Sequence, residues 1–77
     1  MNDARREEIR RALTLIEEAK GILEIVLDQE QDDFDNMPED VQNDEEGQRA
    51  EEAVDALEQA AVCCDDAISA SKEVLQD

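Results

Sequence analysis

The sequence AEEAVDALEQAAVCCDDAISASKEVL, residues 50–75, decides the fold. Apolar residues recur in it at alternating steps of four and three residues, and one member of the series, Ser71, is polar. The series is Ala50, Val54, Leu57, Ala61, Cys64, Ile68, Ser71 and Leu75. These steps are the a/d pattern of a heptad repeat, in which one edge of a helix packs along another helix. The stretch therefore predicts a long α-helix that needs a helical partner.

An earlier segment supplies that partner. Apolar residues recur at helical spacing from Ile9 to Leu27 and cover about half of the helix circumference, which is more than one partner helix covers. Gly21 lies inside this stripe without ending its periodicity, and we interpret it as a point of close helix approach. We expect one helix over about residues 4–30 and a second over about residues 44–75, with Asn43 as the N-cap of the second.

An acidic linker at about residues 31–43 separates the two predicted helices, with a short turn at residues 38–42. Two helices joined by a short linker run antiparallel, and the apolar match places Leu27 opposite Glu46. This alignment brings the basic cluster of the first helix close to acids of the second, namely Arg5, Arg6, Arg10 and Arg11 to Asp65, Asp66 and Glu73.

The predicted fold class is all-α, an antiparallel two-helix hairpin in a single domain over residues 1–77. Both helices keep apolar flanks that the hairpin does not cover, and these flanks predict that two hairpins dimerise into a four-helix bundle. The residues expected in the core or the dimer contact are Leu15, Ile16, Ile22, Leu23, Val54, Leu57, Ala61, Cys64 and Ile68.

The charge narrows the classes of function. The chain holds 24 acidic and 7 basic residues, for a net charge of -17, and all of the excess lies in residues 21–77. A field of this sign disfavours direct binding to nucleic acid or to an anionic membrane and favours a basic protein partner. The sequence has no His, and two helices offer little room for a pocket that tunes a carboxylate, so we expect no enzymatic activity, cofactor or metal.

Cys63 and Cys64 are neighbours on the second predicted helix and cannot form an ordinary disulfide with each other. The sequence also shows no secretory signal pattern and no apolar run of the roughly 20 residues that span a bilayer. These features predict a cytoplasmic protein.

A row of carboxylates on the second helix is the first candidate binding site, formed by Glu51, Asp55, Glu58, Asp65, Asp66 and Glu73. Residues four apart on a helix rise by about 6 Å, which is close to the spacing of phosphates along a nucleic-acid strand. The row could therefore imitate such a strand toward a basic protein. The alternative is a solvated face that keeps a small protein soluble.

The linker is the second candidate, through Phe34, Asp35, Asn36, Met37 and Glu39. Its apolar residues either cap the end of the bundle core or form an exposed recognition patch. Acids at residues 28, 30, 32 and 39 match four positions of a calcium-binding EF-hand loop, but Asp33 replaces its required Gly and Pro38 precedes its last ligand. Loose cation condensation is the alternative to specific calcium binding.

Two segments of the chain resemble a known family. Residues 34–42 read FDNMPEDVQ and residues 50–60 read AEEAVDALEQA. They are similar to small acidic helical-hairpin proteins of bacteriophages and prophages, with the pattern (F/Y)-D-N-M-P-E-x-(L/V)-Q, a Gly-containing linker and A-E-E-A-(I/V)-D-A-L-E. The match covers residues 34–60, about a third of the chain. The resemblance implies a phage-encoded accessory or host-interacting protein and transfers no catalytic role.

The sequence thus predicts a non-enzymatic protein that binds and inhibits or modulates a basic, nucleic-acid-binding host protein, as in counter-defence. The alternative is a structural, assembly or adaptor protein that acts through its helical bundle and linker.

Overall fold

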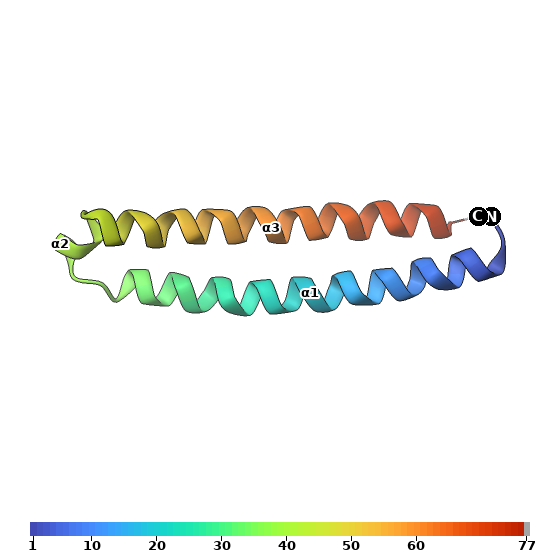
Figure 1. Cartoon of the computed structure of the whole chain (residues 1–77), viewed down its shortest axis with the longest axis horizontal. Coiled ribbons are helices and arrows are strands. Elements are labelled where there is room, and N and C mark those ends of the chain that lie inside the picture. Colours follow the sequence, from blue (N-terminus) through green and yellow to red (C-terminus); the bar gives the residue numbers. More distant parts are fainter. Residues whose placement is uncertain (77) are drawn as a thin grey trace.

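The computed structural model describes residues 1–76, and these residues form three α-helices and no strand. The helices are α1 (Asp3–Asp35), α2 (Glu39–Gln42) and α3 (Glu45–Leu75). α1 and α3 lie side by side and antiparallel, with α2 at the turn between them (Figure 1). The Cα positions extend over 58 × 14 × 14 Å. The all-α prediction is confirmed, and the extended arrangement fits a helical hairpin or coiled coil.

The contact between α1 and α3 follows one heptad repeat on each helix. On α1 nine half-covered residues occupy these positions: Arg6, Ile9, Leu13, Ile16, Lys20, Leu23, Leu27, Glu30 and Phe34. Three of them, Arg6, Lys20 and Glu30, are charged. On α3 the covered positions are Gly47, Ala50, Val54, Leu57, Ala61, Cys64, Ile68, Ser71 and Leu75. Val54, at 6% exposure, is the only buried apolar side chain in the described part of the chain.

α1 begins at an Asn cap and ends later than the sequence predicts. The Asn2 side-chain oxygen accepts a hydrogen bond of 2.8 Å from the Arg5 backbone N–H. The predicted end near residue 30 is wrong, because the helix continues to Asp35. The additional turn is held by a 2.9 Å hydrogen bond from the Gln31 amide to the Asp35 carboxylate and by the partly covered Phe34. The predicted linker is correspondingly shortened at its start.

The predicted register of the two helices is also wrong. In place of an arginine, Lys20 lies beside Asp65, with 2.5 Å between the ammonium nitrogen and a carboxylate oxygen. This contact shifts α3 along α1 by about twelve residues, or slightly more than three helical turns, relative to the predicted alignment. Arg10 and Arg11 instead pair within α1, with Glu7 at 3.0 Å and Glu8 at 3.7 Å. The cause is the longer α1, which moves the turn away from Leu27.

The turn between α2 and α3 is fixed by contacts of backbone groups at the beginning of α3. The N-cap of α3 is Asp44 and not Asn43, since the Asp44 carboxylate accepts hydrogen bonds from the N–H groups of Glu46 and Gly47. Gly47 is buried, and a Cβ atom on it would overlap the backbone of Gln42. The glycine that permits close approach is therefore Gly47. The predicted role of Gly21 is wrong, because a Cβ atom there would meet nothing within 4 Å.

Candidate functional site: two sides of the helix pair

Carboxylates from both long helices line one side of the α1–α3 pair. On α3 three of them occupy e positions, each directly after a residue of the α1–α3 contact, and Asp55 lies between them at a b position. On α1 two of the matching e positions hold acids, Glu17 and Glu24. Because the helices are antiparallel, the two e edges border the same side of the pair. We call this surface the acidic side and define it by Glu17, Glu24, Glu51, Asp55, Glu58 and Asp65.

All six carboxylates that the sequence predicted as a binding row are exposed, but they do not form one row. Glu51, Asp55 and Glu58 are successive neighbours on the acidic side, three or four residues apart. Asp65 lies further along the same edge of α3, after the apolar Val62, and forms an ion pair with Lys20. The other two predicted members, Asp66 and Glu73, occupy the outermost positions of the α3 heptad and point away from the acidic side.

The acidic side includes two residues that the sequence analysis missed, Glu17 and Glu24 of α1. Their position on this side can be assigned only when Lys20 is recognised as a contact position of the α1 heptad. The electrostatics support the placement, since both Asp65 of α3 and Glu24 of α1 act on the Lys20 ammonium group. The charge of α1 therefore adds to that of α3 on this side.

Lys20 links the two helices within this acidic surface. Its side chain is 28% exposed, and its hydrogen bond to Asp65 is the main cause of a pKa raised above the ordinary value of 10.5. The negative charges of Asp65 and Glu24 raise the Lys20 pKa further, while partial burial opposes the rise. Lys20 thus remains charged at neutral pH and neutralises part of the acidic side at its midpoint.

The Lys20–Asp65 pair should make stability fall at alkaline pH. A lysine whose pKa is higher in the folded than in the unfolded chain stabilises the fold below about pH 10, and this contribution is lost as pH rises through the folded value. We expect the free energy of unfolding to decrease above about pH 10 more for the natural protein than for Lys20→Gln. Urea unfolding of both proteins at each pH measures the difference, and parallel pH profiles would contradict the prediction.

The predicted linker residues are divided between a helix end and the turn. Phe34 and Asp35 belong to α1, Asn36 is its C-cap, Met37 follows, and Glu39 begins α2. Phe34 and Met37 are half-covered, and the Phe34 carbonyl oxygen accepts a 2.9 Å hydrogen bond from the Gln42 side chain. Phe34 is the last α1 residue of the α1–α3 contact, and Met37 follows it at the turn.

The residues that match positions of an EF-hand calcium loop do not form a loop in the structure. Its first positions, Asp28, Glu30 and Asp32, lie within α1, so their side chains point in different directions around a helix. Among residues 1–76, no group of three or more acidic or Cys side chains is arranged to hold a metal ion.

The residues predicted for the core or the dimer contact fall into two sets. Members of the α1–α3 contact are Ile16, Leu23, Val54, Leu57, Ala61, Cys64 and Ile68. Leu15 and Ile22 instead lie outside it, with exposures of 56% and 62%. Both occupy c positions of the α1 heptad, on the side opposite the acidic one.

We call this second surface the apolar side. From α1 it comprises Ala12, Leu15, Ala19, Ile22 and Val26, and from α3 it comprises Ala53, Ala56, Ala60, Cys63, Ala67, Ala70 and Val74. Both rows again alternate at steps of three and four residues, and neither contains a charged residue. Each long helix thus carries a second heptad pattern, fully exposed on α1 and partly exposed on α3, beside the one used between α1 and α3.

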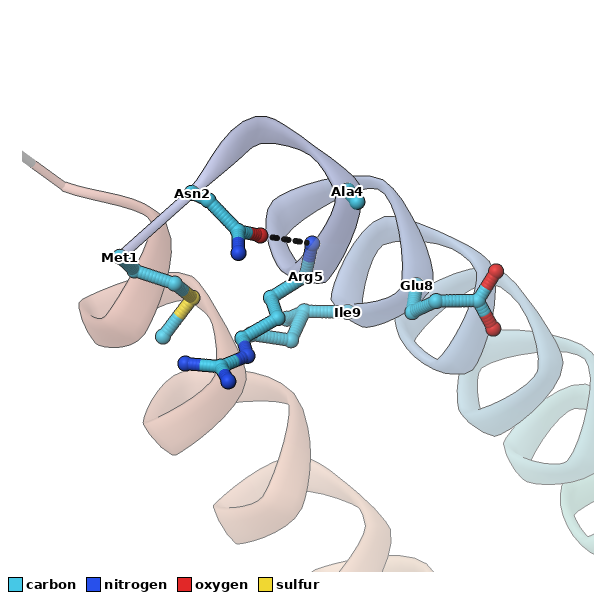
Figure 2. Close-up of a pocket in the computed structure, with 6 residues that line it drawn as sticks. All are labelled: Met1, Asn2, Ala4, Arg5, Glu8 and Ile9. Carbon is cyan, nitrogen blue, oxygen red and sulfur yellow. Dashed lines mark hydrogen bonds between the residues drawn. The ribbon is translucent and has the colours of Figure 1, made fainter.

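A shallow hollow lies at the beginning of α1 and is lined by Met1, Asn2, Ala4, Arg5, Glu8 and Ile9 (Figure 2). The Asn2 side chain caps the helix, and the Arg5 and Glu8 side chains point in different directions. The hollow therefore brings together no pair of ionisable groups suited to acid–base chemistry.

No described helix is both long and apolar enough to cross a membrane. No known protein family, curated protein or solved structure matches the chain.

Proposed function

We propose that the protein is a non-enzymatic binding protein whose acidic side engages a basic protein, and that the α1–α3 pair acts as a hairpin that dimerises into a four-helix bundle. The observation that carries the proposal is the concentration of exposed carboxylates from two helices on one side of a rod of net charge -17. This charge is far larger than solubility requires of a small domain, for which a magnitude of about 2–8 is typical.

The partner class follows from the chemistry of this surface. Exposed carboxylates attract lysine and arginine side chains and repel phosphate groups, so nucleic acid and anionic membranes are disfavoured as direct ligands. Glu51 and Asp55 are four residues apart and rise by about 6 Å along the helix, and Glu58 follows after one further turn. A protein that binds the phosphates of a nucleic-acid strand offers positive groups at comparable intervals.

The biological setting of the proposal comes from the resemblance to phage and prophage proteins. A phage protein that occupies the nucleic-acid site of a host protein would inhibit it, as a counter-defence protein does. We propose this role in the cytoplasm of a bacterial host.

The acidic side is tested by neutralising three of its carboxylates. In the triple variant Glu51→Gln, Asp55→Asn and Glu58→Gln, we expect affinity for a captured basic partner to fall roughly tenfold or more, since exposed ion pairs contribute up to about 1 kcal/mol each. The matched control removes the same charge from the outer faces of the helices through Glu18→Gln, Asp32→Asn and Glu52→Gln. It should bind nearly as well as the natural protein.

The measurement starts from immobilised protein exposed to a bacterial lysate at low salt. Bound proteins should be released by added salt and by a DNA or RNA oligonucleotide, because both weaken contacts to a phosphate-binding site. Equal binding by the two triple variants would overturn the acidic-side proposal. If Phe34→Ala and Met37→Ala abolish binding while the acidic-side variant retains it, recognition lies in the linker, and the adaptor function takes its place.

A further inference from the structure

The apolar side is too large and too regular to be a solvated surface. Leu15 and Ile22 are each more than half exposed, and both lie in a row without charges. The α1–α3 contact alone buries a single apolar side chain, Val54, among the described residues. A core of this size is insufficient for a chain of 77 residues, which usually needs a disulfide, a metal or a second subunit.

We infer that the apolar side binds a second copy of this chain with the two rods antiparallel, so that α1 packs on α1 and α3 on α3 across a two-fold axis at the level of Ala19 and Cys63. The inference rests on the homodimer included in the proposed function and assigns its interface and geometry. The occupant is a second copy because each row is complementary to itself.

The self-complementarity can be followed along the chain. The α1 row is symmetric about Ala19, since Ala12 and Val26 are each seven residues away from it. The α3 row is symmetric about Cys63, with Ala56 and Ala70 at equal separations. When each row is reversed about its centre, apolar residues meet apolar residues along its whole length, as an isologous interface requires.

One axis can serve both rows because their centres lie within one helical turn of each other along the rod. The Lys20–Asp65 ion pair fixes the level of the two helices, and it is one residue from Ala19 and two residues from Cys63. Because the helices are antiparallel, the two offsets add to three residues, or about 4.5 Å along the rod, which is less than one helical turn. A two-fold axis perpendicular to the rod therefore passes close to both centres.

The charge distribution selects the antiparallel arrangement of the rods. Residues 28–46, at the turn, contain ten acids and no base, whereas Arg5, Arg6, Arg10 and Arg11 lie at the opposite end. Parallel rods would place the two acidic turns together, and antiparallel rods place each turn beside the basic end of the other copy. The same arrangement sets Arg5 opposite Asp33 of the second copy, because both are fourteen residues from Ala19.

The available area suits a stable dimer. One face of a rod of 58 by 14 Å covers about 800 Å², which matches the area that each partner contributes to a standard protein–protein interface. The alanines of α3 permit close approach of the two α3 helices, while Leu15 and Ile22 fill the wider space between the α1 helices. The two acidic sides then face outward on opposite sides of the bundle and remain free for a partner.

Two isoleucines of α1 provide a matched test of the interface. Ile22 belongs to the apolar side and Ile25 does not, although their exposures are 62% and 61%. At about 20 μM we expect sedimentation equilibrium to give twice the chain mass for the natural protein and for Ile25→Glu. For Ile22→Glu we expect the apparent dissociation constant to rise at least a hundredfold. A monomeric natural protein, or equal effects of the two substitutions, would overturn the inference.

A thiol cross-link tests the geometry even if the Ile22 variant is too unstable to analyse. With Cys64→Ala, the exposed Cys63 is the only thiol, and the proposed axis places it next to its counterpart. A disulfide between the two copies requires about 4.4–6.8 Å between their Cα atoms. Mild oxidation should give a covalent dimer, and Cys63→Ala, which keeps Cys64 in the α1–α3 contact, should not. Absence of the Cys63 cross-link, or a faster one through Cys64, would overturn the proposed axis.

The acidic-side triple variant separates this inference from the proposed function. It should dimerise like the natural protein, because none of its substitutions touches the apolar side. Loss of partner binding with an intact dimer supports both proposals. A monomer that still binds a basic partner through the acidic side overturns the dimer alone.

Discussion

Val54→Asp should unfold the protein at neutral pH, whereas Val62→Asp should leave it folded. Both valines are on α3 and both substitutions add one negative charge, but Val54 is 6% exposed and Val62 is 50% exposed. At position 54 the change places an unpaired charge in the α1–α3 contact and removes its only buried apolar side chain among the described residues. We expect a cost of about 5 kcal/mol or more there, because the lost valine contacts and the uncompensated buried charge both contribute, and at most about 1 kcal/mol at position 62.

The comparison is made by circular dichroism and urea unfolding at one protein concentration. Small domains have total stabilities near the lower end of about 5–15 kcal/mol, so a loss of this size removes most of the helical signal at room temperature. Similar unfolding midpoints for the two variants would contradict the prediction and would mean that the α1–α3 contact does not hold the fold.

The heptad pattern of α3 could be predicted in full because its contact positions hold almost only small and aliphatic residues. The series from Ala50 to Leu75 shows without interruption which edge of the helix is covered. The prediction of the N-cap was one residue too early, because Asn43 and Asp44 are both favourable caps and only the backbone of the turn distinguishes them.

The heptad of α1 was harder to recognise because charged residues occupy three of its contact positions. Arg6, Lys20 and Glu30 are half-covered at these positions, where a long charged side chain can cover the interface with its aliphatic stem. A pattern based on apolar residues alone included Leu15 and Ile22 beside the contact residues and ended near Leu27. This error shortened the predicted helix and shifted the register.

The acidic side could be predicted only in part for the same reason. Its α3 members follow from the α3 heptad, but Glu17 and Glu24 join them only when the phase of α1 is known. The turn also depends on an interaction that no local pattern contains, the approach of Gly47 to the backbone of Gln42.

Gly47→Ala and Gly21→Ala should change stability in opposite directions, although both exchange glycine for alanine inside a long helix. At Gly47 the new methyl group would overlap the Gln42 backbone, which cannot move away as a side chain can, so α2 must separate from α3. We expect a loss of about 1–3 kcal/mol, the range for overpacking. At Gly21 the methyl group meets nothing within 4 Å, and the higher helix propensity of alanine should add up to about 1 kcal/mol.

Thermal unfolding at a fixed protein concentration measures both effects, since 1 kcal/mol corresponds to roughly 4–8 °C for a domain of this size. A rise for Gly21→Ala excludes a general intolerance of α1 and α3 to added methyl groups, which leaves the contact with Gln42 as the cause of the loss at Gly47. If both variants gained stability, the turn would not be packed against α3 through this glycine. The Asp44 cap would then be the main constraint on where α3 begins.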